Sequence, residues 1–298
     1  MRGHGSNQPS VGFRVCDEPD FEELKGVLAA ADRTIMNTGV VAREKLFAPD
    51  ARASPQTIAE VVNGRIEGFA TICGRVLRLI AVRPESQRSG IGSRLLGEAE
   101  RRIFANSDRV IVGAGPGNYL VPGVDATDGG TLAFFAAHGY SAEREQAIDL
   151  RAPLPPATAP IPEEYEIRRP AGAERGCVEK FVREDFAFSW GWEIGRAFDR
   201  DGEPSCLVAE RKGEIAGFAG WEINNRGLGT FGPQGVSRHH RSKGLGGALL
   251  LATLHEMSRE GYDEVHIPWV SSVEYYRRYT GARVVARYEL MEKRKGVS

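Results

Sequence analysis

The sequence predicts a mixed α/β protein that is built from two copies of one structural unit. A glycine loop of the form Q/R-x-x-G-x-G occurs at residues 87–92 and again at 241–246, each time between an apolar run and a helix-like segment. A second motif, G-x-I-x-G-F-A, begins at Gly64 and again at Gly213, and it precedes the loop in both places. Repeated motifs in one order indicate a duplication. The proline-rich residues 151–162, which disfavour helix and central strand, lie between the copies.

Each copy is expected to contain its elements in the order β-α-β-β-β-α-β-α-β. The first copy is predicted to have strands from residue 13 and at 57–62, 66–72, 76–82 and 109–112, with helices at 21–31, after the glycine loop and at 131–138. The second copy has strands from residue 165 and at 206–210, 215–223, 228–236 and 264–269, with helices at 174–188, after the loop and at 272–279. A last strand closes each copy. Asn63-Gly64 and Lys212-Gly213 are typical of tight hairpin turns, and Gly139 and Gly281 of helix C-caps.

The chain length favours two domains over one. Its 298 residues are predicted to divide into a disordered tail at 1–10, an N-terminal domain at 11–150, an extended linker at 151–162 and a C-terminal domain at 163–298. The helix after the first loop has one apolar face, because apolar residues recur every four positions at Ile91, Leu95, Ala99 and Ile103.

The bulk composition disfavours several classes of function. The formal net charge of −1 gives no support for a nucleic-acid partner. No run of about 18 apolar residues is present, so no membrane partner is expected, and residues 1–10 lack the apolar core of a secretory signal. Four cysteines, Cys16, Cys73, Cys177 and Cys206, show no C-x-x-C spacing, which predicts a reducing cytoplasmic location with neither a metal site nor disulfides.

The glycine loops are suited to binding a pyrophosphate. Glycines lack a Cβ atom, so phosphate oxygens can approach the backbone N–H groups that open the following helix. A dinucleotide fingerprint requires a third glycine, but Leu95 and Leu249 occupy that position, and the P-loop signature is absent. Arg88, Arg241 and Lys243 add positive charge. The alternative, a glycine-tolerant turn with solvated basic residues, stays open from the residues alone.

The strand, loop and helix resemble the acetyl-CoA motif of the GCN5-related N-acetyltransferase (GNAT) superfamily. The element order resembles that fold in both halves, as in tandem members of the superfamily. The resemblance implies two tandem acyl-CoA N-acyltransferase-like domains, each a mixed sheet flanked by helices. It also implies acetyl-CoA as cosubstrate, no metal, and direct attack of an amine on the thioester without an acyl-enzyme.

The resemblance assigns cofactor-binding residues in both halves. The pyrophosphate would lie on Gln87, Arg88, Ser89, Gly90, Ile91 and Gly92 in the first half, and on Arg241, Ser242, Lys243, Gly244, Leu245 and Gly246 in the second. A backbone N–H near Val82 or Val236 would polarise the thioester carbonyl.

The superfamily acid is usually a tyrosine on the short helix after the fifth strand, and Tyr276 best matches that position. Tyr275 and Tyr279 remain alternatives in register, and packing is the alternative role for these aromatic side chains. The first half has Phe135 at the matching place, and phenylalanine cannot donate a proton. The C-terminal half is therefore expected to be catalytic, while the N-terminal half either binds acetyl-CoA or only supports the fold.

The general base is expected to be Glu222, at the end of a strand beside Trp221. A solvated strand-end residue is the alternative, and an ordered water could serve as base instead. Trp190, Trp192 and Glu193 are expected either to line the acceptor side or to pack at an interface. The long stretch at 113–130 is expected to wall a substrate pocket or to seal the contact between halves.

The predicted function is acetyl-CoA-dependent N-acetyl transfer to the primary amine of a small molecule. Two alternatives remain: a non-enzymatic acyl-CoA-binding sensor or scaffold, and a protein-lysine acetyltransferase with an open groove. The sequence does not identify the acceptor, and a homodimer stays open.

Overall fold

The computed structural model describes residues 11–31, 39–115, 117–158, 160–241 and 243–296. The tail expected at residues 1–10 and the loop residue Ser242 lie outside the described residues.

The elements of the first half follow the expected order. They are β1 (Val11–Cys16), α1 (Phe21–Ala31), α2 (Gly39–Phe47), β2 (Pro55–Val62), β3 (Arg65–Cys73), β4 (Val76–Val82), α3 (Ile91–Ile103), β5 (Arg109–Val112), β6 (Val124–Asp125), α4 (Gly129–Ala137) and β7 (Ser141–Pro153). The sequence did not predict α2 or the two-residue β6.

The second half repeats the pattern. Its elements are β8 (Glu166–Arg168), α5 (Arg175–Asp185), α6 (Phe188–Gly195), β9 (Cys206–Arg211), β10 (Glu214–Trp221), β11 (Phe231–Val236), α7 (Leu245–Arg259), β12 (Glu264–Ile267), α8 (Val273–Thr280) and β13 (Arg283–Arg294). Short 3-10 helices at Pro84–Ser86 and Arg238–His240 precede the two glycine loops. The duplicated α/β architecture is therefore confirmed.

The G-x-I-x-G-F-A motif has a structural cause in both halves. Its first glycine lies in a hairpin turn, where Gly64 and Gly213 both have a φ of +84°. Its second glycine lies under the strand that leads to the glycine loop. A Cβ at Gly68 would lie 2.8 Å from the Ala81 carbonyl oxygen, and one at Gly217 would lie 3.0 Å from the Gly235 carbonyl oxygen. Any larger residue at this second position would push the two strands apart.

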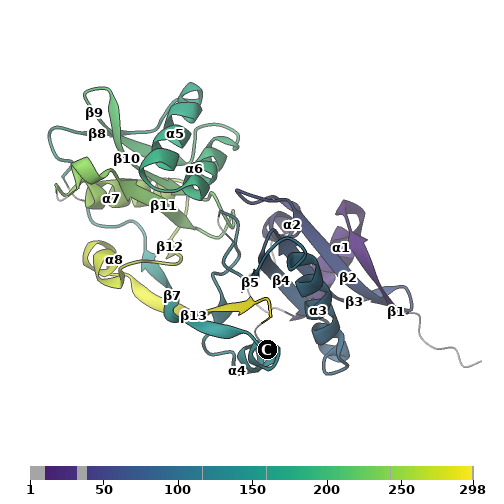
Figure 1. Cartoon of the computed structure of the whole chain (residues 1–298). Helices are drawn as coiled ribbons and strands as arrows, with labels where there is room; N and C mark the ends of the chain where they lie inside the picture. Colours follow the sequence, from purple (N-terminus) through teal and green to yellow (C-terminus); the bar gives the residue numbers. More distant parts are fainter. Residues whose placement is uncertain (1–10, 32–38, 116, 159, 242, 297–298) are drawn as a thin grey trace, which may run out of the picture.

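The two halves exchange their last strands (Figure 1). The large sheet has the order β1-β2-β3-β4-β5-β13-β7-β12, with β6 also paired to β13, and the small sheet has the order β11-β10-β9-β8. Thus β13, from the end of the chain, pairs with β5 of the first half. Conversely, β7 pairs with β12 of the second half, and β7 and β13 pair with each other.

This exchange corrects the expected domain boundaries. A cut between 11–150 and 163–298 would remove β13 from the sheet that it completes, and β7 continues through Pro153 into the predicted linker. The two-unit arrangement holds, but neither unit closes its sheet alone. The physical reason is that the last strands have similar patterns, so the sequence of each strand does not specify which sheet edge it joins.

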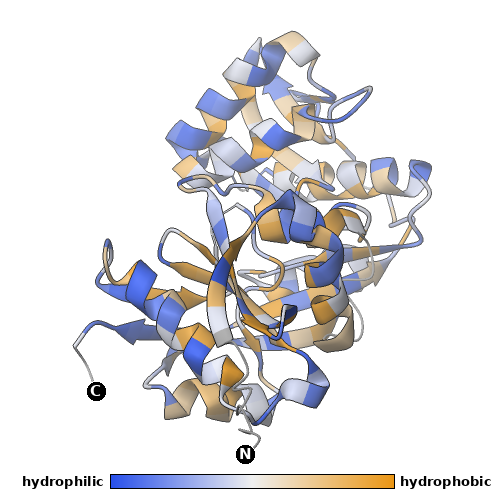
Figure 2. Cartoon of the chain, turned by 90° about the vertical axis from the view of Figure 1, so that its right-hand side faces the viewer, coloured by the Kyte–Doolittle hydropathy of each residue, from blue (hydrophilic) through white to orange (hydrophobic). Residues whose placement is uncertain are grey.

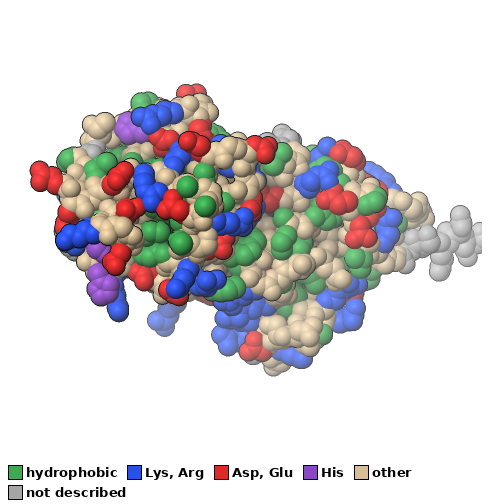
Figure 3. All heavy atoms as spheres, turned by 90° about the horizontal axis from the view of Figure 1, so that it is seen from above, with side chains coloured by type: hydrophobic (Ala, Val, Ile, Leu, Met, Phe, Trp, Pro, Cys, Tyr) green, Lys and Arg blue, Asp and Glu red, His purple; other side chains and the backbone are tan. Residues whose placement is uncertain are grey.

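The helices pack apolar faces against the sheets. In α3 the four predicted positions Ile91, Leu95, Ala99 and Ile103 are all buried, which confirms the expected face. Figure 2 shows hydrophobic residues concentrated in the strands and on one side of the helices. On the face drawn in Figure 3, Lys and Arg are interspersed with Asp and Glu rather than gathered into one continuous basic surface. Within the described residues, no helix is long and apolar enough to cross a membrane.

Candidate active site

The two glycine loops have the same backbone geometry. Gly90 caps α3 with a φ of +84°, and Gly244 caps α7 with a φ of +80°. In this left-handed conformation the loop turns sharply into the helix, whose first N–H groups have no partner within the helix. These groups and the helix dipole form an anion-binding position in each half.

The same side-chain contact holds each loop against its strand. Gln87 Nε2 donates to the Val82 carbonyl oxygen at 3.2 Å, and Arg241 Nε donates to the Val236 carbonyl oxygen at 3.1 Å. In the second loop, Lys243 Nζ also bonds Glu164 at 2.9 Å. The predicted loop residues are thus brought together twice, in equivalent arrangements.

The strand before each loop separates from its parallel neighbour. Strand β4 pairs with β5 only at residues 76–77, and β11 touches β12 through the single bridge Thr230–His266. Ser237 N donates to Ala216 of β10, so by the alternation of an antiparallel ladder the Val236 N–H points to the opposite edge. Among the described residues no strand pairs with that edge beyond the bridge. The same alternation holds for Val82, because Arg83 N donates to Glu67 of β3. Each opening can therefore accept an extended ligand that pairs with backbone groups.

The halves differ at the predicted acid. A Cβ at Gly92 would lie 3.5 Å from the Phe134 ring, and one at Gly246 would lie 3.1 Å from the Tyr275 hydroxyl, so these two aromatic residues are equivalent. The next residue is Phe135 in the first half, which is buried in the core at 1% exposure. Its counterpart, Tyr276, lines a cavity instead.

This cavity has a volume of about 480 Å³ and is lined by both halves. Its aromatic lining residues are Tyr119, Trp190, Phe231, Trp269 and Tyr276. Its polar ones include Ser189, Glu193, Asn224, Asn225, Thr230 and Gln234. Tyr119 comes from the first half's long stretch, and the strand that leads to the second glycine loop supplies Gln234. The cavity thus lies beside the opening of β11.

Three titratable residues that line this cavity have raised pKa values: Tyr119, Glu193 and Tyr276. Of these, Tyr276 lies on α8, where the acid is expected, and Glu193 is the single carboxylate. Burial raises the pKa of Glu193 to about 7, against the lowering effects of Arg196 and Lys45. Burial also raises the pKa of Tyr276 to about 12, so its phenol keeps its proton at neutral pH. Tyr276 packs edge-on against Phe231, with ring centroids 6.3 Å apart. One group can accept a proton near neutral pH and the other can donate one.

Comparisons with known proteins agree with this geometry. Residues 173–282, which contain the second loop and α8, match the acetyltransferase (GNAT) family. The chain is 27% identical over 291 residues to a mycothiol acetyltransferase from Actinosynnema mirum, covering 84% of this chain and 87% of that protein. A tandem GNAT protein from the clavulanic acid biosynthesis pathway superposes with a TM-score of 0.73 at 18% identity, covering 97% of this chain and 100% of that one.

A further solved structure extends the comparison. It is a GCN5-related glucosamine N-acetyltransferase region of a fungal multi-domain β-N-acetylglucosaminidase, with a TM-score of 0.81 at 16% identity. The alignment covers 96% of this chain but only 38% of that longer protein. The chain contains a GNAT acetyltransferase domain at residues 173–282 and has the fold of tandem GNAT proteins. It is therefore an N-acetyltransferase, and its family uses acetyl-CoA as the acetyl donor.

The predicted base of this GNAT protein, Glu222, does not lie in the cavity. Its carboxylate accepts hydrogen bonds from the backbone N–H of Gly227 and, at 2.8 Å, from that of Thr230. It lines a separate depression with Arg200 and Tyr262. Glu222 therefore fixes the turn between β10 and β11, and its acceptor atoms are already used.

The other predicted acceptor-side residues have different roles: some line the cavity and one packs at the interface between the halves. Trp190 lines the cavity together with Glu193. Trp192 instead packs at the contact between the halves, since a Cβ at Gly117 would lie 2.9 Å from its ring. The 113–130 stretch has both expected roles, because Tyr119 walls the cavity and the Leu120 carbonyl oxygen accepts a hydrogen bond from Asn225 of the second half.

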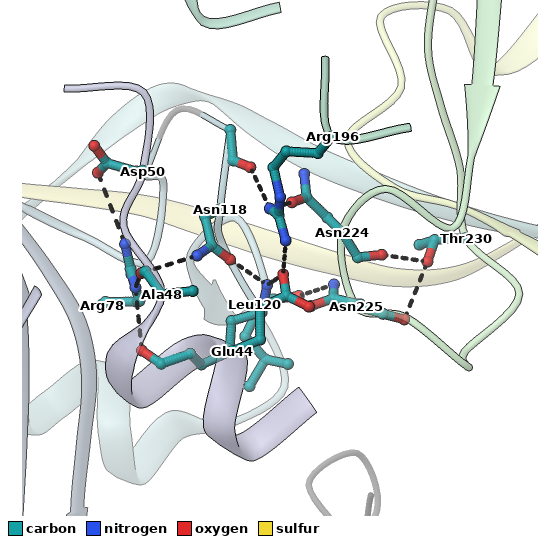
Figure 4. A network of polar contacts seen from close by, with 12 residues as sticks. Glu44, Ala48, Asp50, Arg78, Asn118, Leu120, Arg196, Asn224, Asn225 and Thr230 are labelled. Atoms are coloured by element: carbon teal, nitrogen blue, oxygen red, sulfur yellow. Dashed lines mark hydrogen bonds and ion pairs between the residues drawn. The ribbon is translucent and has the colours of Figure 1, made fainter. Parts of the chain in front are cut away.

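A buried polar network reaches Glu193 through Asn224, and Figure 4 shows its members Glu44, Arg196 and Asn224. Asn224 donates to Glu193, and Arg196 donates to the Asn224 side-chain oxygen at 2.7 Å. Arg196 also pairs with Glu44 of α2 at 3.2 Å. Lys45, which is fully buried, bonds Glu44 at 2.8 Å, and its pKa is lowered to about 8 mainly by burial. The sequence signal for this network was the charged run Arg43-Glu44-Lys45 between apolar residues of α2.

Removing the central carboxylate of this network is expected to destabilise the protein. Burial raises the pKa of Glu44, but Lys45 and Arg196 together lower it more, so the carboxylate is charged in the folded protein. The substitution Glu44→Gln leaves two cations without their counter-charge, and we expect a loss of about 3 kcal/mol in the free energy of unfolding at pH 7. Urea unfolding measures it. Because the folded pKa is lowered from 4.5, the loss should diminish as pH falls below 4.5 and disappear once pH has fallen through the lower folded pKa.

A matched exposed pair provides the control. Glu22, 75% exposed, pairs with Lys25 at 2.6 Å on α1. We expect Glu22→Gln to leave the free energy of unfolding almost unchanged, since exposed pairs contribute little. Equal effects of Glu22→Gln and Glu44→Gln would contradict the importance of the buried network.

Proposed function

We propose that this enzyme transfers the acetyl group of acetyl-CoA to the primary amine of a small molecule bound in the cavity between the halves. The observation that carries the proposal is that Glu193 and Tyr276, from α6 and α8, line one cavity beside the open edge of β11. The pyrophosphate would lie on the backbone of the second loop, where Arg241, Lys243, Gly244, Leu245 and Gly246 are placed.

In this proposal each residue has one step. The Glu193 carboxylate accepts a proton from the acceptor's ammonium group, and the freed amine attacks the thioester carbon. The Val236 N–H donates to the carbonyl oxygen as negative charge develops on it. Tyr276 donates its phenolic proton to the departing sulfur, and the second proton that the amine nitrogen loses returns to the phenolate. One C–N bond forms, one C–S bond breaks, and the products are the amide and CoA.

Small-molecule transfer is favoured over the other two functions by specific features. Residues of both halves surround the cavity, whereas a protein-lysine acceptor requires an open groove. A sensor requires no proton donor at the acid position. Phe135 of the first half has none, but Tyr276 of the second half does. We therefore place acetyl transfer in the second half.

The substitution Gly244→Val tests the proposed pyrophosphate site. A β-branched residue disfavours a left-handed backbone by about 1–2 kcal/mol, so the loop is expected to move its N–H groups away from the phosphate position. We expect acetyl-CoA to bind about tenfold more weakly or worse, as measured by isothermal titration. The stoichiometry of the wild-type titration also reports whether the first loop binds.

Gly213→Val provides a matched control. Gly213 has a φ of +84° and no atom within 4 Å of a built Cβ, as at Gly244, but it lies in the hairpin between β9 and β10. Replacing Gly213 with valine introduces the same backbone strain away from the proposed pyrophosphate site. We therefore expect the affinity for acetyl-CoA to stay unchanged. If wild-type protein fails to bind acetyl-CoA, the proposal is wrong.

A further inference from the structure

The charges around the cavity restrict which amines can enter it. Among the described lining residues Glu193 is the single charged side chain, and none is Lys, Arg or His. The nearest cation behind the wall, Arg196, is already bonded to Glu44 and to the Asn224 side chain. A carboxylate or phosphate on the ligand would therefore find no cationic partner and would face Glu193. Burying an unpaired charge beside a like charge is costly.

The aromatic walls of the cavity are suited to a ring. Tyr119 and Trp269 meet edge-to-face, with centroids 5.5 Å apart, and Trp269 remains 40% exposed. Trp190, which lines the cavity, stacks on Phe186, which does not; their ring centroids are 6.0 Å apart. Aromatic faces attract both cations and the flat faces of rings.

The backbone that carries Trp269 is held in place by a buried carboxylate. Trp269 has a φ of +48°, and its N–H donates to Asp149 Oδ1 at 2.8 Å. The other oxygen of Asp149 bonds His266 Nε2 at 2.8 Å. Asp149 is buried and lies on β7, the strand that the first half contributes to the second. The exchanged strand therefore fixes an aromatic wall of the cavity.

One buried acceptor in the lining lacks a partner. Asn225 is 2% exposed, and its Nδ2 donates to the Leu120 carbonyl oxygen at 3.1 Å. That bond fixes the orientation of the amide, and Oδ1 has no hydrogen-bond partner among the described residues. An unsatisfied buried acceptor costs about 1–3 kcal/mol. A hydroxyl or N–H group on a ligand that reaches this oxygen would satisfy it.

We infer that the acceptor is a primary amine attached to a ring that carries no negative charge and bears a hydroxyl or N–H donor. This inference rests on the proposed function and specifies the substrate class of the same site. Glu193 receives the ammonium, the aromatic side chains contact the ring, and Asn225 accepts the donor's hydrogen bond. Phenolic amines and amino sugars share this chemistry, and the test distinguishes them.

The test uses pairs of amines that differ by one feature. Tyramine is compared with tyrosine, and glucosamine with glucosamine 6-phosphate, so each pair differs by one anionic group. Phenethylamine lacks the hydroxyl of tyramine, and hexylamine lacks a ring. Release of CoA thiol gives kcat/KM for each. We expect kcat/KM of the uncharged member of the productive pair to exceed kcat/KM of its anionic partner by about tenfold or more. We also expect the hydroxyl and the ring each to raise kcat/KM relative to the amine that lacks it. The productive pair shows whether the ring is phenolic or a sugar.

A charge inserted in the wall provides the converse test. Ser189 lines the cavity and is only half-buried, so it tolerates a long side chain. We expect Ser189→Arg to shift the kcat/KM ratio toward the anionic partner by about tenfold, and the uncharged control Ser189→Gln to leave the ratio unchanged. Trp269→Ala should reduce the preference for ring amines over hexylamine.

The outcomes separate this inference from the proposed function. Equal turnover of tyramine and tyrosine, and of both sugars, would overturn the inference while acetyl transfer stands. Binding of uncharged ring amines, seen as quenching of tryptophan fluorescence, without any thiol release would support the inference and overturn the transfer proposal. Quenching by the anionic partners at the same concentrations would overturn the inference independently of turnover.

Discussion

The substitution Tyr276→Phe is expected to lower kcat by about 10²- to 10⁴-fold, the range for losing a positioned general acid. Phenylalanine keeps the edge-on contact with Phe231 and removes one oxygen, so the protein should fold and bind acetyl-CoA as before. Steady-state release of CoA thiol measures the change. Because the phenol acts on the leaving sulfur, we expect kcat to fall much more than KM changes.

Tyr279 is the matched control for Tyr276. It lies on the same helix, three residues further on, and its ring packs against Gly247 of α7 instead of lining the cavity. We expect Tyr279→Phe to retain most of the wild-type kcat. A large loss in Tyr279→Phe together with full activity in Tyr276→Phe would show that the register of the acid was assigned wrongly.

The substitution Glu193→Gln is expected to lower activity and to raise stability. Glutamine retains an oxygen that can accept from Asn224, but it cannot take a proton from the acceptor. We expect kcat/KM to fall by about 10²-fold or more at pH 7. The wild-type rate should rise through the pKa of Glu193, about 7, and this rise should be absent in the variant.

The stability gain depends on pH with a definite sign. Burial raises the pKa of Glu193 from 4.5 to about 7, so the folded state binds a proton that the unfolded state releases between these values. The stability of the wild type therefore falls as pH rises from 4.5 to 7, and above pH 7 the full cost applies, up to about 3 kcal/mol. We expect the variant to have a higher Tm than wild type at pH 8, and a nearly equal Tm at pH 5.

Thermal unfolding of both proteins at these two pH values checks the expectation. A variant that is less stable than wild type at pH 8 would show that the charged carboxylate is stabilised in the folded protein. In that case Glu193 would be a structural ion pair, and its assignment as the base would be withdrawn.

Much of the candidate site could be predicted from local sequence. The two glycine loops and their preceding strands were located correctly, because a left-handed glycine before a helix is a local requirement. The hairpin turns at Gly64 and Gly213 and the helix cap at Gly281 followed from the same kind of chemistry. The absence of a donor at Phe135 could also be read directly, since it depends only on the residue type.

The proposed base could not be predicted in this way. Glu222 and Glu193 each follow a tryptophan, and nothing in the local sequence distinguishes which of them would face a cavity. The deciding facts were that backbone N–H groups of a turn use the Glu222 carboxylate, while Glu193 lies at a wall formed by both halves. These facts depend on residues far apart in the chain.

The sequence by itself determined the duplicated unit, its order of strands and helices, and the paired glycine loops, because each depends on turns, caps and periodicities within a few residues. The tertiary structure alone decided that β7 and β13 exchange sheets, that Asp149 bonds the Trp269 backbone across that exchange, and that Glu193 and Tyr276 line one cavity. Strand pairing and burial are set by contacts between distant segments. Two similar halves offer each last strand two similar edges, and only the packing of the complete chain distinguishes them.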